Sequence, residues 1–182
     1  LTPPKDTHMT AHTGGIRIEN LRKVYGQGDT AVEALRNVNL HVAPGEVVGL
    51  VGPSGSGKST LLKCLGAIIE PTSGRMTLGD EVIYDNGWAT PDLRALRRDR
   101  IGFVFQAPYL ISFLDVTDNV ALLPMLAGMP DAPARAQALE LLTALDVQHR
   151  APTLPTQLSG GEPQRAATAP GPVHTPTAIA AE

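Results

Sequence analysis

The first part of the chain changes its hydrophobic pattern from a period of two to a helical period. Apolar and polar residues alternate in 16–18 and again in 38–42, which predicts strands with one buried face. The run 46–51 is almost continuously apolar and rich in valine, as expected of a parallel strand that is buried on both faces. Apolar residues then recur at helical spacing, at Leu61, Leu62, Leu65 and Ile68 or Ile69. The pattern predicts a strand, a glycine-rich loop and a helix, in that order.

The middle of the chain alternates between short strands and a charged helix. A turn at 71–74 leads into a short strand at 75–79. Arginine and aspartate are interleaved over 93–100, which predicts a helix with a solvated charged face. The run 101–105 is apolar and has the length of a further strand.

Helical patterns dominate after this strand. The segment Asp115-Val116-Thr117-Asp118 offers an N-cap for a helix over 119–126, and Asp131 begins a second helix. We expect the apolar face of the second helix to be formed by Leu139, Leu142 and Leu145. The range 107–158 is therefore predicted to be an α-helical subdomain.

The loop between the predicted strand and helix, Gly52-Pro53-Ser54-Gly55-Ser56-Gly57-Lys58-Ser59, has the residues of a phosphate-binding loop. Its glycines allow the backbone to curl until several N–H groups converge on phosphate oxygens. The helix N-terminus that follows favours an anion. Lys58 would place its charge on the outer phosphates, and the Ser59 hydroxyl would be the protein ligand of Mg²⁺. We expect the nucleotide to contact Gly52, Pro53, Ser54, Gly55, Ser56, Gly57, Lys58, Ser59 and Thr60.

A second motif narrows the class of nucleotide-binding protein. Kinases, GTPases, helicases and transporter ATPases all carry such a loop. The signature sequence of the ABC ATPases is more specific, and it resembles Leu158-Ser159-Gly160-Gly161-Glu162, which we call the signature segment. The chain resembles that family from about Ile16 to its end. The resemblance implies an α/β fold, a P-loop NTPase with a mostly parallel sheet core, an N-terminal antiparallel β part and a helical subdomain. It implies ATP and Mg²⁺ as cofactors, and a second nucleotide-binding subunit whose Ser159, Gly160, Gly161 and Glu162 complete the site in trans.

Two further residues match the family by their order in the chain. Tyr25 stands where the family has an aromatic residue that stacks on adenine; the alternative is that it merely covers apolar surface at a strand end. Gln106 follows the strand at 101–105 and matches the family's glutamine that touches Mg²⁺ and senses the membrane partner. A polar residue that caps a strand edge is the alternative for Gln106.

The resemblance also implies a membrane partner. The stretch 33–46, the strand ending at Gln106 and Asp118-Asn119-Val120 are similar to the lipoprotein-release and macrolide-export branch of the family, in which transmembrane permease subunits choose the cargo. The apolar loop around Tyr109, Leu110, Ile111 and Phe113 is either a docking point for such a subunit or packing beneath the helical subdomain. The expected location is the cytoplasmic face of the plasma membrane, reached through the partner.

Composition agrees with a peripheral subunit. The 182 residues are 42% hydrophobic, and a net charge of −3 gives no basic footprint for nucleic acid. No apolar stretch approaches the roughly 20 residues that span a bilayer, so direct membrane insertion is not expected. Residues 1–15 are polar and predict a disordered tail without a signal peptide. Cys64, the only cysteine, is expected to be a buried thiol.

The end of the chain departs from the family. A long helix should follow the signature segment, but Pro170-Gly171-Pro172 ends it near Ala169. Alignment on Val173, Pro176 and Ile179 puts Glu182 in the place of the family's Mg²⁺-holding aspartate, and the general base that would follow is missing. His174 precedes the strand and cannot replace the family's switch histidine. The expected nucleotide-binding domain, 16–182, is therefore incomplete, with its C-terminal strands missing.

Two explanations of this departure are open. One is a degraded or incomplete record of an ordinary transport ATPase. The other is a genuine truncated homologue, a non-catalytic nucleotide-binding remnant or regulatory fragment. A P-loop kinase is a more distant alternative, because the Ser159-Gly160-Gly161 motif is foreign to that class.

Overall fold

The computed structural model describes residues 14–168 and 177–181. Its elements fall into two compact units, formed by Leu1–Thr60 with Glu70–Pro91 and by Leu61–Ile69 with Asp92–Glu182. The helix that follows the phosphate-binding loop, α1 (Lys58–Leu65), runs from the first unit into the second.

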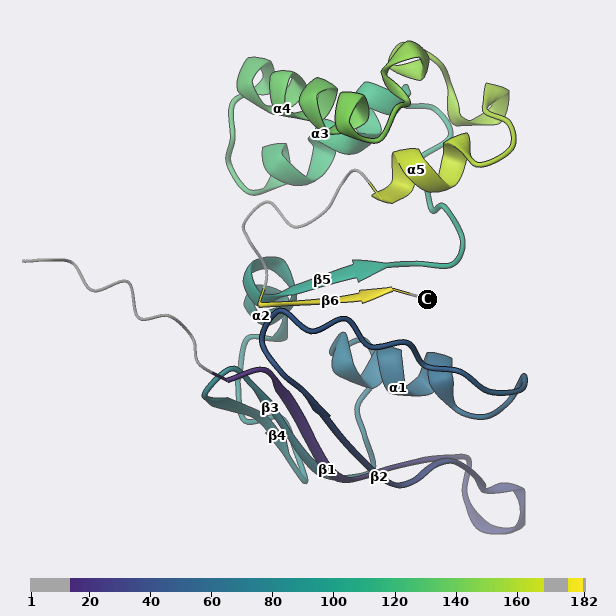
Figure 1. Cartoon of the computed structure of the whole chain (residues 1–182), viewed down its shortest axis with the longest axis vertical. Coiled ribbons are helices and arrows are strands. Elements are labelled where there is room, and N and C mark those ends of the chain that lie inside the picture. Colours follow the sequence, from purple (N-terminus) through teal and green to yellow (C-terminus); the bar gives the residue numbers. More distant parts are fainter. Residues whose placement is uncertain (1–13, 169–176, 182) are drawn as a thin grey trace, which may run out of the picture. The chain divides into compact units, whose positions relative to one another are not determined.

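An antiparallel sheet forms the body of the first unit (Figure 1). Its strands are β1 (Ile16–Tyr25), β2 (Val32–Val42), β3 (Ser73–Leu78) and β4 (Glu81–Asp85), in the spatial order β2-β1-β3-β4. A short 3₁₀ turn, η1 (Gly28–Thr30), joins β1 to β2. The predicted strands at 16–18, 38–42 and 75–79 are confirmed, and β4 is an addition that the sequence analysis did not foresee.

Alternation along these strands buries one face of the sheet. Ile18 pairs with Leu40 on one side and Met76 on the other, and both Ile18 and Met76 are buried. Tyr84 on β4 is also buried, donates its hydroxyl to the Pro71 carbonyl at 2.8 Å, and meets Trp88 edge-on. These residues supply the apolar burial that an isolated sheet lacks.

The predicted buried strand at 46–51 is wrong. Its residues adopt no strand conformation, and among the described residues no strand pairs with them. Val47 and Val51 are 97% and 94% exposed. A parallel strand satisfies its backbone groups only between neighbouring strands, so an apolar run alone does not form one. The mostly parallel core is wrong for the described residues too, since parallel pairing there is limited to β5 and β6.

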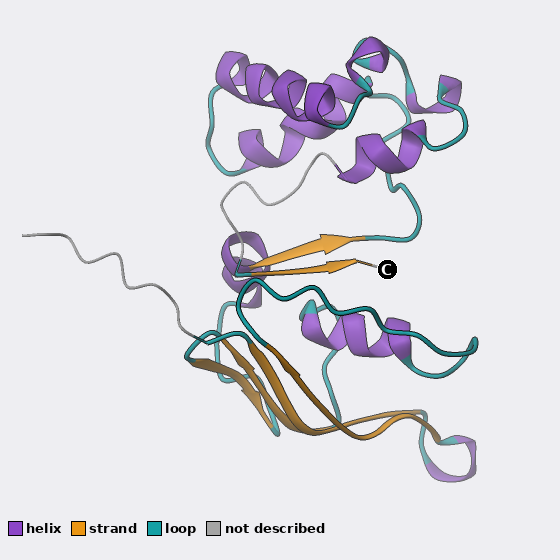
Figure 2. Ribbon diagram, in the orientation of Figure 1, coloured by secondary structure: helices purple, strands orange, loops and turns teal. Residues whose placement is uncertain are grey.

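The second unit contains most of the helices (Figure 2). Helix α2 (Leu93–Arg100) leads into β5 (Ile101–Val104), which pairs in parallel with β6 (Ala178–Ala181), Ile101 opposite Ala178. Helices α3 (Val116–Leu126), α4 (Asp131–Ala144) and α5 (Glu162–Thr168) follow β5, with the 3₁₀ turns η2 (Gln148–Arg150) and η3 (Pro155–Gln157) before α5. The boundaries of the subdomain expected over 107–158 stay a prediction.

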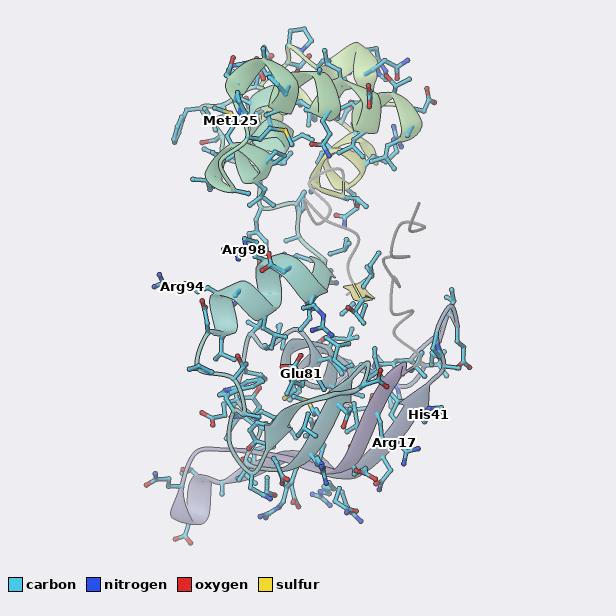
Figure 3. The ribbon with its side chains drawn as sticks, turned by 90° about the vertical axis from the view of Figure 1, so that its left-hand side faces the viewer. Arg17, His41, Glu81, Arg94, Arg98 and Met125 are labelled. Carbon is cyan, nitrogen blue, oxygen red and sulfur yellow. The ribbon has the colours of Figure 1, made fainter. Side chains whose placement is uncertain are left out.

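Two predictions from local sequence, an N-cap and a charged helix, are confirmed in this unit. The Asp115 carboxylate accepts a hydrogen bond from the Asp118 N–H at 2.7 Å, so the predicted N-cap is confirmed, although α3 begins earlier than expected. Helix α2 is confirmed, with Asp92 as its N-cap. Its Arg94 and Arg98 are exposed, as Figure 3 shows, which confirms the solvated face.

The predicted apolar face of α4 is confirmed at Leu142, which is buried, and at Leu145, which packs against the core, and it is wrong at Leu139. Ala134, Ala138 and Leu142 are buried at intervals of four, whereas Leu139 is 44% exposed. The two alanines allow α4 to approach α3 closely, so the buried stripe follows the small residues. The core of the unit consists of Val116, Val120, Ala121, Ala134, Ala138, Leu142, Val147, Ala151 and Ala166.

Candidate nucleotide site

The phosphate-binding loop wraps around the ammonium group of Lys58. Lys58 Nζ donates to the carbonyl oxygens of Gly52 at 2.9 Å and Pro53 at 2.7 Å, and to Ser56 Oγ at 3.1 Å. The lysine is the first residue of α1, so its charge lies at the N-terminus of a helix. All three acceptors are neutral oxygens. Negatively charged phosphate oxygens can take their place and would form stronger, charge-assisted hydrogen bonds with the ammonium group. The loop residues lie together as the sequence predicted, but their contacts with nucleotide stay predictions.

Gly57 shows why the loop needs glycine. Its φ is +90°, and a Cβ placed on it would lie 2.5 Å from the Ala34 carbonyl oxygen. Gly55 also has a positive φ, +80°, but a Cβ there would meet nothing within 4 Å. The loop is therefore pressed against β2 at Gly57 and open at Gly55.

Helix α1 has an exposed polar face and a buried face. Ser59 is exposed, and its hydroxyl has the oxygen chemistry that Mg²⁺ prefers. Cys64 is fully buried, which confirms the predicted buried thiol. Burial of the far side anchors the helix on which Lys58 and Ser59 stand.

Tyr25 ends β1 in the same unit and is 42% exposed. Lys23 Nζ lies 5.0 Å from the centre of its ring and donates to the Glu70 carbonyl at 2.7 Å. The cation holds one face of the ring by a cation–π contact. Stacking of adenine on Tyr25 stays a prediction.

Gln106 belongs to the second unit and follows β5 as an exposed residue. The carbonyl of Phe105, its neighbour, accepts a hydrogen bond from Gln164 Nε2 of α5 at 2.9 Å. The Phe105 ring packs against Phe103 and Tyr109, at centroid distances of 4.6 and 5.3 Å. The backbone beside Gln106 is therefore held by α5, and the role of its side chain as a Mg²⁺ ligand stays a prediction.

The Glu162 carboxylate holds the signature segment through hydrogen bonds. Oε2 of Glu162 accepts from the Ser159 N–H at 2.9 Å and lies 3.3 Å from Ser159 Oγ. Ser159-x-x-Glu162 has the spacing of a capping box, but only the return of the acid to the Ser159 N–H is present, and the Glu162 N–H donates to the Ser159 carbonyl at 3.1 Å. This signal was present in the sequence and was not used there.

Two residues that the sequence analysis missed hold the other oxygen of this carboxylate. Arg150 Nε donates to Glu162 Oε1 at 2.8 Å, and His149 Nε2 lies 3.2 Å from the same atom. The Arg150 guanidinium, the Ser159 N–H and His149 together lower the pKa of Glu162 to about 2, and partial burial opposes them. Glu162 is thus already engaged within its own chain, and its contact with nucleotide in trans stays a prediction.

The loop after β5 has one packed side and one exposed side. Leu110 packs against the helical core, whereas Tyr109 and Phe113 are 76% and 80% exposed. The buried Asn119 fixes the loop: its Oδ1 accepts from the Ile111 N–H, and its Nδ2 donates to the carbonyls of Ile111, Leu114 and Asp115. Packing beneath the helical subdomain therefore holds for Leu110, whereas docking of a membrane subunit on Tyr109 and Phe113 stays a prediction.

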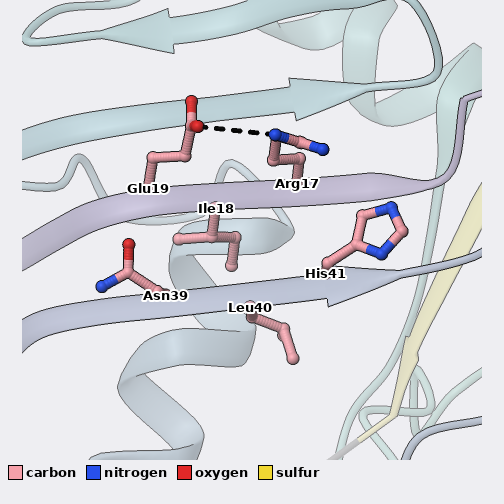
Figure 4. Close-up of a pocket in the computed structure, with 6 residues that line it drawn as sticks. All are labelled: Arg17, Ile18, Glu19, Asn39, Leu40 and His41. Carbon is pink, nitrogen blue, oxygen red and sulfur yellow. Dashed lines mark ion pairs between the residues drawn. The ribbon is translucent and has the colours of Figure 1, made fainter.

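A shallow pocket on the antiparallel sheet lies apart from these residues in the sequence. It is lined by Arg17, Ile18, Glu19, Asn39, Leu40 and His41 (Figure 4). Arg17 pairs with Glu19 at 3.7 Å, so its charge is already countered. None of the predicted site residues lines this pocket, and its paired charges do not make a phosphate site.

Several predictions from the sequence fall outside the described residues. These concern residues 1–13 of the tail predicted over 1–15, Pro170-Gly171-Pro172 with His174, and Glu182. Helix α5 reaches Thr168, the last residue described before the gap, and β6 ends at Ala181. Within 14–168 and 177–181, no helix is both long and apolar enough to cross a membrane.

Comparison with known proteins identifies the family. Residues 35–179 match the family model described as ABC transporter. The lipoprotein-releasing system ATP-binding protein LolD of Novosphingobium aromaticivorans is 41% identical over 168 residues, 92% of this chain and 74% of the relative. The uncharacterized ABC transporter ATP-binding protein MJ0796 of Methanocaldococcus jannaschii is 40% identical over 172 residues, 92% of this chain and 72% of the relative.

Solved structures agree with this assignment. A dimeric structure of the MJ0796 ATP-binding cassette in a post-hydrolysis state, bound to ADP and Pi, matches with a TM-score of 0.77 and 38% identity. The match covers 85% of this chain and 68% of that chain. The chain therefore belongs to the ABC transporter family, as an ABC-type ATPase and the ATP-binding subunit of a transporter.

Proposed function

We propose that this subunit works as a head-to-tail pair of copies that binds MgATP and drives membrane subunits of the lipoprotein-release and macrolide-export branch. The dimeric cassettes among its structural relatives and the names of its LolD relatives support this proposal. In each composite site, the phosphate-binding loop of one copy would face the signature segment of the other. ATP would close the pair, and hydrolysis would reopen it.

The observation that carries the proposal is the position of the Lys58 ammonium inside its loop. Three loop oxygens surround it at 2.7 to 3.1 Å, so the charge is oriented before nucleotide arrives. Lys58 would bind the outer phosphates, and the loop N–H groups would bind the phosphate oxygens next to them. Preorganisation of this kind lowers the entropic cost of binding.

The donor set also fits Mg²⁺. Ser59 of the first unit exposes a hydroxyl, a hard oxygen ligand of the type that this ion takes together with substrate phosphates. Gln106 of the second unit has a side-chain oxygen of the same type, and we propose it as a further ligand on its chemistry alone. When bound, the ion would neutralise charge that develops on the transferred phosphoryl group. Tyr25 would stack on adenine, and Ser159 of the second copy would approach the γ-phosphate.

The membrane partner would dock on the loop after β5. Tyr109 and Phe113 are the two most exposed aromatic residues of the described chain, while Asn119 holds the backbone beneath them. Exposed apolar side chains on a fixed backbone are typical of a protein docking site. Docking to permease subunits would hold the chain at the cytoplasmic face of the plasma membrane.

Sedimentation of the full chain with and without MgATP tests the proposal. We expect the wild-type chain to associate into pairs when ATP is present, and Lys58→Ala to stay monomeric at the same concentration. Lys63→Ala is the matched control, because it removes a lysine from the last turn of the same helix. Phosphate release measured on the same samples separates a catalytic pair from one that binds ATP without turnover.

Two results would contradict the proposal. A wild-type chain that binds ATP and stays monomeric at high concentration would exclude the ATP-closed pair. Association that is identical in wild type and Lys58→Ala would show that pairing does not depend on the phosphate-binding loop.

A further inference from the structure

The Glu162 carboxylate joins two segments of the second unit. Through Oε1 it accepts from Arg150 of η2, and through Oε2 it accepts from the Ser159 N–H of the signature segment. The Glu162 side chain is only 11% exposed, compared with 37% for Arg150 and 54% for His149. A carboxylate removed this far from water needs a cation, and Arg150, at 2.8 Å, is closer than His149, at 3.2 Å.

Arg150 stands on a backbone that is itself fixed. The carbonyl of Ala151, its neighbour, accepts from both the N–H and the hydroxyl of Thr117, each at 3.0 Å. Val116 donates its N–H to the Thr153 carbonyl at 3.0 Å. The first turn of α3 therefore anchors the segment that carries Arg150, and the guanidinium is held on a rigid support.

The two contacts of Ser159 differ in strength. Its N–H lies at an ordinary hydrogen-bond distance, 2.9 Å, from Glu162 Oε2, whereas its hydroxyl lies at 3.3 Å from the same atom. A hydroxyl bond normally has a length of about 2.7 to 2.8 Å, so this second contact is weak. The carboxylate thus fixes the backbone of Ser159 and leaves its hydroxyl free to turn towards another acceptor.

We propose that Arg150 is a positioning residue for the signature segment, acting on Ser159 through the Glu162 carboxylate. Arg150 does not touch the nucleotide in this account. It keeps the Glu162 carboxylate in place, which holds the Ser159 backbone so that the hydroxyl can meet the γ-phosphate bound by a second copy. The inference rests on the proposed function for that last step, but the link from Arg150 to Ser159 lies within one chain.

Amide hydrogen exchange of Ser159, measured by NMR on the full chain without nucleotide, tests this link. We expect exchange to be at least about tenfold faster in Arg150→Gln, since a charge-assisted contact is lost. Arg135→Gln is the matched control: Arg135 of α4 forms ion pairs with Asp118 and Asp131 in the same unit and has no described contact with the signature segment. Exchange of Ser159 should be unchanged in this control.

A second experiment measures ATP binding and ATP-dependent pairing in the same variant. In Arg150→Gln, ATP binding to the single chain should match wild type, while ATP-dependent pairing should weaken by at least about tenfold. Arg150→Lys, which keeps the charge, should recover part of the pairing. A structural role alone would affect both ATP binding and pairing through loss of the fold.

The outcomes are distinct. The inference is overturned if the Ser159 amide of Arg150→Gln exchanges at the wild-type rate. It is also overturned if this amide exchanges faster but the variant still pairs as tightly as wild type. If Arg150→Gln does not fold, Arg150→Lys replaces it, with faster Ser159 exchange and weaker pairing than wild type expected, and wild-type values for either one overturn the inference. If the wild-type chain binds no ATP, the proposed function fails, and the exchange measurement still decides the link from Arg150 to Ser159.

Discussion

Gly57 of the phosphate-binding loop lies against Ala34 of β2 so closely that a Cβ on the glycine would be 2.5 Å from the alanine carbonyl oxygen. The contact fixes the loop to the antiparallel sheet of the first unit. It also distinguishes Gly57, where a Cβ would clash with the backbone, from Gly55, where a Cβ would meet nothing within 4 Å.

Gly57→Ala should therefore destabilise the first unit more than Gly55→Ala. Both residues have positive φ, +90° and +80°, so both alanines carry conformational strain, but only the Gly57 variant meets a backbone oxygen. We expect the free energy of unfolding to fall by about 1 to 3 kcal/mol more in Gly57→Ala. Urea unfolding followed by the fluorescence of Trp88, the only tryptophan, measures it in this unit. Equal losses in the two variants would contradict the close contact.

Leu142→Ala tests which face of α4 is buried. Leu142 is fully buried, so its truncation should cost about 2 to 5 kcal/mol of unfolding free energy. Leu139→Ala on the same helix removes a side chain that is 44% exposed and should cost less than about 1 kcal/mol. Urea unfolding followed by helical circular dichroism distinguishes them. A larger loss in Leu139→Ala would contradict the burial of Leu142 and the exposure of Leu139.

Asn119→Ala should loosen the loop that carries Tyr109 and Phe113. The variant leaves the polar groups of Ile111 and the carbonyls of Leu114 and Asp115 without their side-chain partner, at a cost of about 1 to 3 kcal/mol. Limited proteolysis should cut within 107–114 sooner than in wild type.

Asn39→Ala provides the control for that experiment. Asn39 is exposed and contacts only the backbone of Asn20 and Asn37 among its described hydrogen bonds. Its replacement should leave cleavage at 107–114 unchanged. Equal cleavage of Asn119→Ala and wild type would show that the asparagine does not fix the loop.

The ion pair of Glu162 should make stability depend on acid pH. Arg150, Ser159 and His149 lower the pKa of Glu162 from its ordinary value of 4.5 to about 2 in the folded chain. The folded state therefore binds this proton less readily than the unfolded state. The stabilisation is fully present above pH 4.5 and is lost as pH falls through about 2.

Comparison of wild type with Glu162→Gln isolates this effect. Between pH 4.5 and 2, the wild-type chain should lose unfolding free energy faster than the variant, which has no proton to bind at this position. Urea unfolding at several pH values measures both. Parallel pH profiles would contradict a strongly engaged carboxylate.

The sequence predicted those parts of the molecule that local chemistry determines. The Asp115 cap, helix 93–100 and the loop around Lys58 depend on residues a few positions apart, and each is present. The family followed from the order of the loop and the signature segment. Such features are readable because their partners are neighbours in the chain.

The missed features depend on partners from elsewhere. The run 46–51 has the composition of a buried strand, but a strand forms only beside another strand, and none of the described strands pairs with it. Arg150 approaches Glu162 because Thr117 anchors its segment, a relationship that spacing does not reveal. On α4, leucine spacing identified Leu142 and Leu145 correctly, but it included the exposed Leu139 and missed the buried Ala134 and Ala138.

Calorimetric titration of the full chain with ATP in the presence of Mg²⁺ tests the central claim most directly. We predict saturable binding of one ATP per chain, weakened about tenfold or more in Lys58→Ala and unchanged in Lys63→Ala. A wild-type chain that takes up no ATP, or a Lys58→Ala variant that binds it as tightly as wild type, would contradict the account.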